Sequence, residues 1–295
     1  MSWGASAFSV VRMALTAGGV IVAVVLALKI GVLVLEPRFT FFPVRTYFET
    51  PAAAGLPFED VFLRTEDGVR LHGWFIPAEE RAGEDAVTLL LFHGNAENIG
   101  GCLDLAALAR PAGYNLLLLD YRGYGKSEGR PSERGVYRDG EAALLHLLHL
   151  KSRAGVDPGR IVVWGRSIGA AVAVHLAAGD GGSLPGVAGV ILESPFTSVP
   201  DLLRSGGHYA LLAMSRFGTY RFDSAARIGR VAAPVLVIHG TDDEIAPFEL
   251  GRRLFESAPG RKELVAIRGG GHNDLWALHA DEIWGAVRRF LASLD

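Results

Sequence analysis

The pentapeptide GRSIG at residues 165–169 constrains this chain more than any other feature. It follows residues 161–164, an apolar run rich in β-branched side chains that predicts a buried strand. The small apolar residues at 170–178 then predict a closely packed helix. In the pattern GxSxG, a serine at a sharp strand-to-helix turn presents its hydroxyl above the sheet, and a Cβ on either flanking glycine would clash with neighbouring backbone. We therefore predict a nucleophilic Ser167, although a chain with 37 glycines can contain this pattern by chance.

The rest of the chain alternates strand-like and helix-like segments. Continuous apolar runs, which are typical of strands covered on both faces, lie at 87–92, 114–120, 160–164, 187–192, 234–239 and 264–267. Helical patterns lie at 101–110, 132–153, 168–178, 249–257 and 281–294. Strand-like character from 39 to 77 includes a hairpin pattern at 61–65 and 69–76, and a polar loop follows at 78–85. This alternation predicts one α/β domain with a mostly parallel, twisted sheet and helices on both faces.

Residues 199–233 interrupt the alternation. The stretch stands where a single crossover helix is expected, but it is longer and less regular and carries many large apolar residues. Five arginines against two aspartates give it a local charge of +3. Insertions over the ends of strands commonly act as lids or binding walls, so we expect a short lid at 199–233.

The N-terminus differs in composition from everything that follows. Residues 13–35 are almost wholly apolar, with Lys29 as their only charge, and about 20 apolar residues cross a bilayer as a helix. We therefore predict an N-terminal segment at 1–36 with a transmembrane anchor at 13–35, followed by an α/β domain at 37–295. A cleaved signal peptide is the alternative, but its apolar region would be shorter. Positive charges flank the segment on both sides, so the orientation is open, with a slight bias toward a cytoplasmic domain.

Composition excludes several other classes of protein. The net charge is −3 and the pI about 6.3, so no global basic field favours nucleic acid as a partner. The single Cys102 excludes an intrachain disulfide framework. Neither HExxH nor another cluster of histidine and carboxylate is evident, so we expect no metal and no cofactor. Nothing in the sequence indicates an oligomeric state.

A serine hydroxyl needs a base to take its proton and an acid to orient that base. His272 is the candidate base, because a histidine among glycines in the loop GGGHND has little reason to be there for packing. Asp243, just after the strand at 234–239, is the candidate acid, with Asp242 and Glu193 as rivals. The order serine, acid, histidine along the chain is that of α/β hydrolases.

Acyl transfer also requires N–H groups that stabilise a developing oxyanion. One donor is expected from the residue after the nucleophile, Ile168. The other is expected from the loop HGNAEN at 93–98, after the strand at 87–92. We predict the amide of Asn95 for this second donor, with Ala96 as the neighbouring alternative.

Seven motifs together resemble the α/β-hydrolase superfamily of serine hydrolases. They are FP at 42–43, HGNAEN at 93–98, DYRGYGKS at 120–127, GRSIG at 165–169, ESPFT at 193–197, HGTDD at 239–243 and GH at 271–272. The resemblance runs from about residue 39 to the C-terminus and is closest to a membrane-anchored branch that includes acyl-protein thioesterases and lysophospholipid or monoacylglycerol lipases. It implies hydrolysis of an ester or thioester of a lipid-like or acylated small molecule through an acyl-enzyme. The family pattern HGxxDxxxP places the acid at Asp243.

Two alternatives to this function remain. The first is an amide or peptide hydrolase of the same fold, and the second is a catalytically silent binding protein. Peptidases of the superfamily usually recognise the substrate amine with acidic groups, whereas the expected lid is rich in arginine. Together with the expected anchor, the positive charge of the expected lid suits an anionic lipid surface. Replacement of Arg204 and Arg216 by Glu should therefore weaken hydrolysis of vesicle-borne esters.

Other polar residues are interpreted as structural. Asp120 and Arg122 are expected to form a pair that shapes a loop near the site. His146 and His149 are expected on a helix face, and His239 at a strand end beside the acid loop.

Overall fold

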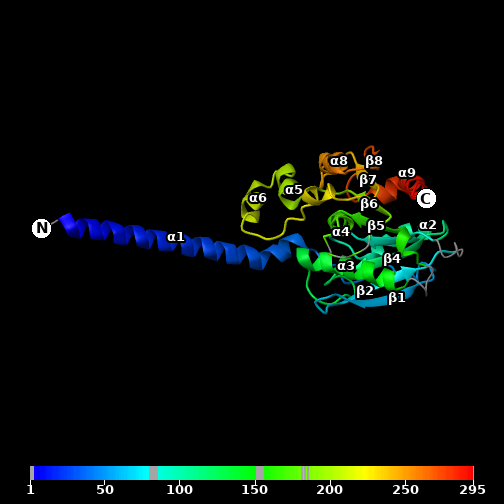
Figure 1. The fold of residues 1–295 in the computed structure, drawn as a ribbon, viewed down its shortest axis with the longest axis horizontal. Coiled ribbons are helices and arrows are strands. Elements are labelled where there is room, and N and C mark those ends of the chain that lie inside the picture. Colours follow the sequence, from blue (N-terminus) through cyan, green and yellow to red (C-terminus); the bar gives the residue numbers. More distant parts are fainter. Residues whose placement is uncertain are drawn as a thin grey trace.

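A computed structural model describes residues 3–79, 86–150, 156–180, 182, 184 and 186–294. In it, one long helix, α1 (Trp3–Thr40), projects from a rounded α/β body (Figure 1). Most of the polar loop predicted at 78–85, and the end of the helix predicted at 132–153, lie outside the described residues.

The body is built on an eight-stranded sheet with the order β1-β2-β4-β3-β5-β6-β7-β8. The strands are β1 (Glu59–Arg64), β2 (Arg70–Ile76), β3 (Thr88–Phe92), β4 (Asn115–Asp120), β5 (Ile161–Arg166), β6 (Gly189–Glu193), β7 (Val235–Gly240) and β8 (Lys262–Ile267). The β1–β2 and β2–β4 pairs are antiparallel, and every other pair is parallel. The predicted hairpin and the mostly parallel sheet are both confirmed.

Helices cover both faces of this sheet. Outside residues 199–233, the described helices of the body are α2 (Leu103–Ala109), α3 (Glu133–His149), α4 (Ile168–Ala177), α8 (Phe248–Ser257) and α9 (Leu275–Ala292), with 3-10 turns η1 (Ile99–Cys102) and η2 (Pro158–Arg160) between them. Two hydrophobic cores result, because successive strand residues point to opposite faces. Val163 of β5 packs with α3, α4 and α8, and the next residue, Trp164, packs with α2 and α9. The α/β-hydrolase arrangement expected from the sequence is therefore confirmed.

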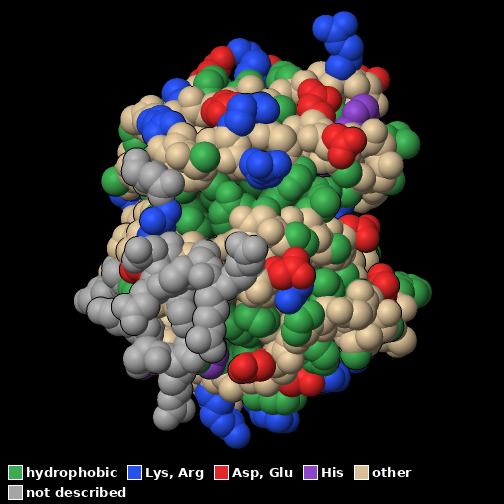
Figure 2. Space-filling model, turned by 90° about the vertical axis from the view of Figure 1, so that its right-hand side faces the viewer, with side chains coloured by type: hydrophobic (Ala, Val, Ile, Leu, Met, Phe, Trp, Pro, Cys, Tyr) green, Lys and Arg blue, Asp and Glu red, His purple; other side chains and the backbone are tan. Residues whose placement is uncertain are grey.

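Residues 199–233 connect β6 to β7 and form three short helices, α5 (Val199–Ser205), α6 (Tyr209–Ser215) and α7 (Ala225–Ile228). We call this stretch the insertion. Its helices α5 and α6 lie beside the end of α1 where that helix meets the body (Figure 1). The face of the body that points away from α1 carries scattered charges of both signs around apolar side chains (Figure 2).

Three boundaries differ from the prediction. Helix α1 continues to Thr40, so strand character from residue 39 is wrong, and no strand begins before Glu59. The helical backbone continues through Pro37, and the last turns of α1 line a cavity described below. Helix α9 begins at Leu275, before the predicted residue 281, because two helical pieces join across a non-helical His279.

Helix α1 contains a stretch, Leu15–Thr40, that is long and apolar enough to cross a membrane, and none of its most apolar window is buried against the protein. A signal sequence near an N-terminus meets the same criteria of length and composition.

Candidate active site

Ser167 lies at the junction of β5 and α4 in a backbone conformation that ordinary residues avoid. Its φ of 54° and ψ of −115° place it outside the regions that L-residues favour. The two flanking glycines make this turn possible. A Cβ on Gly165 would lie 2.1 Å from the carbonyl oxygen of Gly169, and a Cβ on Gly169 would lie 2.2 Å from that of Phe92. The reason given for both glycines from the sequence therefore agrees with the geometry.

The structure brings the three predicted residues together from three separate loops. The Oγ of Ser167 lies 3.1 Å from Nε2 of His272, and Nδ1 of His272 lies 2.7 Å from Oδ2 of Asp243. The serine follows β5, the aspartate follows β7 and the histidine follows β8, so all three lie at the carboxyl edge of the sheet. This is the hydrogen-bonded chain that a serine nucleophile requires.

Asp243 is surrounded by hydrogen-bond donors. Its Oδ1 accepts from the amides of Ile245 at 3.0 Å and Ala246 at 2.7 Å, and its Oδ2 lies 3.2 Å from Nε2 of His239. Burial acts to raise the pKa of Asp243, but the bonds from His239 and His272 act against it and hold that pKa well below its usual range. The carboxylate is therefore ionised wherever the protein is folded at ordinary pH, as an acid that stabilises an imidazolium must be.

The contact of His239 with the acid was missed from the sequence. His239 was assigned a structural role at a strand end, and its Nε2 does lie 2.7 Å from the carbonyl oxygen of Ala246. The available signal was its position four residues before Asp243 in HGTDD.

The two rival acids lie elsewhere. The Oδ1 of Asp242 accepts a hydrogen bond from its neighbour Thr241, and its side chain is exposed. Glu193 is buried behind the serine turn, where it accepts hydrogen bonds from the indoles of Trp164 at 3.2 Å and Trp276 at 3.0 Å. Within the part of the chain that the structure describes, neither carboxylate contacts His272.

Both predicted oxyanion donors line one cavity with Ser167 and His272. Across the described residues, no hydrogen bond engages the backbone N–H of either Asn95 or Ile168. The side chain of Asn95 is held in place, because its Nδ2 donates to the carbonyl oxygen of Thr40 at 2.7 Å and its Oδ1 accepts from the hydroxyl of Tyr124 at 2.8 Å. The backbone amide of Asn95 is thus left without a partner in the described residues, while the side chain of Asn95 is held by two hydrogen bonds. Ala96 also lines the cavity.

A carboxylate inside the loop at 93–98 ties it to the serine turn. Oε1 of Glu97 accepts from the amide of Gly94 at 2.6 Å, and its Oε2 lies 3.2 Å from a guanidinium nitrogen of Arg166. The Nε of Arg166 in turn lies 3.2 Å from Glu193. Arg166 therefore links the expected oxyanion loop to the turn that carries Ser167.

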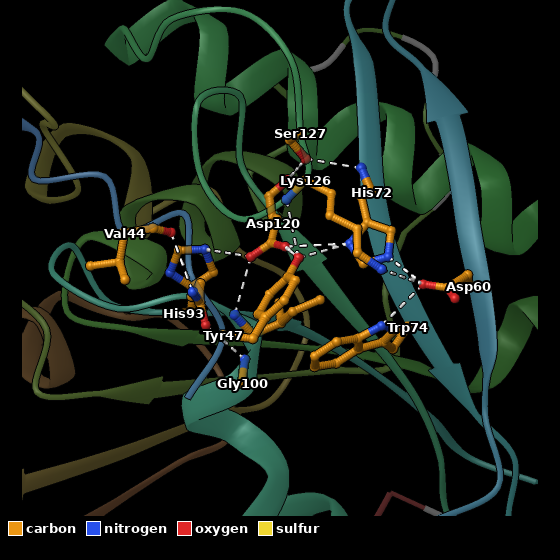
Figure 3. Close-up of polar contacts among 12 residues, drawn as sticks. Val44, Tyr47, Asp60, His72, Trp74, His93, Gly100, Asp120, Lys126 and Ser127 are labelled. Atoms are coloured by element: carbon orange, nitrogen blue, oxygen red, sulfur yellow. Dashed lines mark hydrogen bonds and ion pairs between the residues drawn. The ribbon is translucent and has the colours of Figure 1, made fainter. Parts of the chain in front are cut away.

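A second cluster of buried polar groups supports the same loop from behind (Figure 3). Asp120 accepts a hydrogen bond from the amide of Ile99 at 3.1 Å and another from the hydroxyl of Tyr47. His72 lies with Nδ1 3.4 Å from Asp120 and Nε2 2.6 Å from Asp60. Burial, together with the charge of Asp120, raises the pKa of Tyr47, so its hydroxyl keeps the proton that it donates.

The predicted pair of Asp120 and Arg122 is wrong. The carboxylate of Asp120 is engaged by the cluster just described. Arg122 instead donates from Nε to Asp139 at 2.8 Å and from NH1 to Asp67 at 2.8 Å. Each residue does shape a loop near the site, but through different partners.

The cavity above Ser167 has a volume of about 590 Å³. Its polar end holds Ser167, His272 and the expected oxyanion amides. Its remaining walls are largely apolar and come from two segments far apart in the sequence, the end of α1 and the insertion. Within the described residues, no group of three or more histidine, cysteine or carboxylate side chains could hold a metal ion.

Comparison with known proteins agrees with this architecture. A family model described as serine aminopeptidase, S33, matches residues 83–219. An uncharacterized protein of Mycobacterium tuberculosis is 37% identical over 275 residues, which cover 92% of this chain and 94% of that protein. The α/β hydrolase domain-containing protein WAV2 of Arabidopsis thaliana is 32% identical, over 93% of this chain and 92% of that protein.

Solved structures share the fold at lower identity. An esterase of Pyrococcus furiosus superposes with a TM-score of 0.70 at 20% identity, over 86% of this chain and 97% of that one. The acetyl xylan esterase 1 of a Thermoanaerobacterium species gives a TM-score of 0.61 at 18% identity, over 85% and 86% of the two chains.

Proposed function

Because the chain belongs to the α/β-hydrolase superfamily, we propose that it is a serine hydrolase that cleaves carboxylic ester or thioester bonds of lipid-like or acylated substrates. The observation that carries the proposal is the continuous hydrogen-bonded path from Ser167 through His272 to Asp243 at the end of a largely apolar cavity. A strained serine with a base in contact and an ionised acid behind that base has the parts needed for acyl transfer.

In the proposed reaction, Nε2 of His272 takes the proton of Ser167 while Oγ attacks the substrate carbonyl carbon. The N–H groups of Ile168 and Asn95 stabilise the oxyanion, and loss of one such donor costs about 2.7–4 kcal/mol of transition-state stabilisation. The tetrahedral intermediate collapses, and the leaving alcohol or thiol receives the proton from Nε2. Water then gives a proton to His272 and attacks the acyl-enzyme, which releases the acid and returns the proton to Ser167. Asp243 stabilises each imidazolium that forms.

The cavity favours an ester or thioester over a peptide with a free amine. An amine-recognising site needs an unengaged carboxylate near the scissile bond, and two glutamates line this cavity. Glu97 is paired with Arg166, and both oxygens of Glu36 accept hydrogen bonds from Thr219 and Tyr220. Neither carboxylate is free to hold an ammonium group, which supports the choice of an acyl substrate with an apolar chain.

We further propose that α1 stays attached and anchors the protein in a membrane as a single span, with the orientation open. Support comes from the contact between Glu36 of α1 and the insertion, and from the share of the cavity wall that α1 contributes. Removal of α1 as a signal sequence would open the cavity on that side.

Hydrolysis of a matched substrate series tests the proposed reaction. The full chain in detergent is assayed with p-nitrophenyl butyrate, the corresponding thioester and alanine p-nitroanilide, with Ser167→Ala as the blank. We expect turnover of the ester and thioester that the blank lacks, and no turnover of the anilide. Preference for the anilide would establish the amide hydrolase instead, and a folded protein inactive on all three would favour a silent binding protein.

A further inference from the structure

One face of α1 belongs to the cavity. The residues of α1 that line it are Val32, Leu35, Glu36, Phe39 and Thr40. Their spacing of three, four, seven and eight residues places them on a single stripe of the helix. Val34 lies between them in sequence but on the other side of the helix, where its side chain is 62% exposed. Helix α1 therefore presents one stripe to the cavity and the rest of its circumference to the surroundings.

The facing wall comes from the insertion. Leu202 and Leu203 of α5 and Leu211 and Met214 of α6 line the cavity opposite α1. Leu211 and Met214 are also exposed, although both are large apolar side chains. The two walls together form an apolar slot that starts at Ser167 and runs between α1 and the helices α5 and α6.

Glu36 joins the two walls of the slot through hydrogen bonds. It is the only acidic residue in residues 3–40. Its carboxylate accepts from the amide of Thr219 at 2.8 Å, from the hydroxyl of Thr219 at 3.0 Å and from the amide of Tyr220 at 2.9 Å. The approach is close enough that a Cβ on Gly218 would lie 2.1 Å from Oε1 of Glu36. The width of the slot is therefore set by a specific contact between α1 and the insertion.

We propose that this slot is the subsite for a long aliphatic acyl chain, and that the chain enters it directly from the lipid leaflet that surrounds α1. The inference rests on the proposed function and names the substrate class of the same site. Helix α1, which lines the slot, is long and apolar enough to cross a membrane, so an acyl chain moving along α1 would stay in contact with hydrocarbon. Passage from leaflet to slot then requires no exposure of the chain to water, which would be the costly step.

Chain-length selectivity tests the subsite, and α1 offers a matched pair of variants. Val32→Trp fills the slot, while Val34→Trp adds the same bulk to the outer side of the same helix. The full chain is assayed with p-nitrophenyl acetate and p-nitrophenyl laurate at one fixed detergent concentration. For the unmodified protein, kcat/KM rises by up to about fourfold per methylene while the slot still has room for the chain.

We expect Val32→Trp to lower kcat/KM for the laurate at least about tenfold and to leave the acetate within about twofold, because only the long chain reaches the added side chain. Val34→Trp changes neither. Equal effects of the two variants, or equal loss on both esters in Val32→Trp, would overturn the subsite. Failure of the proposed function looks different, because then the unmodified protein hydrolyses neither ester.

The source of the chain is tested by placing enzyme and substrate in the same or in separate vesicles. The full chain is reconstituted in phosphatidylcholine vesicles, and a fluorogenic long-chain ester is added either to those vesicles or to a second, protein-free population. Entry from the leaflet predicts hydrolysis at least about tenfold faster in the shared vesicles, since transfer between vesicles requires the chain to cross water. Equal rates in the two arrangements would contradict entry from the leaflet.

Discussion

His272 and His72 are both buried and both bond an aspartate, and they differ in what surrounds them. His272 lies between Asp243 and Ser167, and its ring lines the cavity. His72 lies between Asp60 and Asp120, has no exposed surface and faces the hydroxyl of Tyr47 (Figure 3). The residue types are nearly the same. His272 faces the strained Ser167 and the cavity, whereas His72 joins packed segments of the fold.

A contact between aspartate and histidine does not by itself make a reactive site. The histidine must also be open to a cavity and contact a third residue that can react. Asp243 and His272 meet at the carboxyl edge of the parallel part of the sheet, where loops leave a cavity. Asp120 and His72 meet where β4 pairs with the antiparallel β2, beneath the segment that contains Tyr47. We therefore expect substitutions in the first pair to remove activity, and substitutions in the second to lower stability.

The largest expected effect separates Asp243, which bonds His272, from Asp60, which bonds His72. Asp243→Asn should lower kcat by about 10⁴-fold with little change in fold, because the amide favours the wrong histidine tautomer. Asp60→Asn makes the same change beside His72 and should leave kcat within about threefold, since that histidine touches no substrate. Steady-state hydrolysis of a short ester measures both. A comparable loss in Asp60→Asn would break the distinction between the two pairs.

The next effect is on stability. Asp120→Asn places an amide where Asp120 accepts hydrogen bonds from Tyr47 and the Ile99 amide, and should lower the free energy of unfolding by about 1–3 kcal/mol. Urea denaturation followed by tryptophan fluorescence measures this change. We expect activity of the folded protein to fall by less than about tenfold, through movement of the loop at 93–98. A loss as large as that of Asp243→Asn at unchanged stability would assign Asp120 to the reaction itself.

A smaller effect is expected at the contact between α1 and the insertion. Glu36→Gln keeps one acceptor oxygen but turns an NH₂ group toward the amides of Thr219 and Tyr220. We expect kcat/KM for a long-chain ester to fall about three- to tenfold, while that for acetate changes less, because loss of a typical net hydrogen bond costs about 0.5–1.5 kcal/mol. The ratio of kcat/KM for the long-chain ester to that for acetate measures this difference. An unchanged ratio between the two esters would show that Glu36 does not set the slot.

Much of the fold was predictable because it follows from short-range pattern. Continuous apolar runs predicted the parallel strands, and GxSxG with its flanking segments predicted the turn at Ser167. The loops after β7 and β8 supplied Asp243 and His272 for a physical reason, since parallel strands bring their carboxyl ends to one edge. These residues do lie within hydrogen-bonding distance of one another.

The cavity wall was not predictable in the same way. The contact of Glu36 with Thr219 joins residues 183 positions apart, and no local pattern encodes it. In the sequence, the stripe of α1 that lines the cavity is part of a uniformly apolar segment. The sequence alone therefore does not distinguish the face of α1 that meets the insertion from its other faces. The partners of Asp120 and Arg122 likewise depend on which elements pack beside β4.

Labelling by a fluorophosphonate probe tests directly whether Ser167 is an activated nucleophile, because the probe reacts only with an activated serine. The full chain is labelled in detergent and in vesicles beside Ser167→Ala, with circular dichroism to show that both proteins are folded. We expect labelling of the unmodified protein in both media and none of the variant. A folded, unmodified protein that stays unlabelled in both media, or a variant labelled equally well, would contradict it.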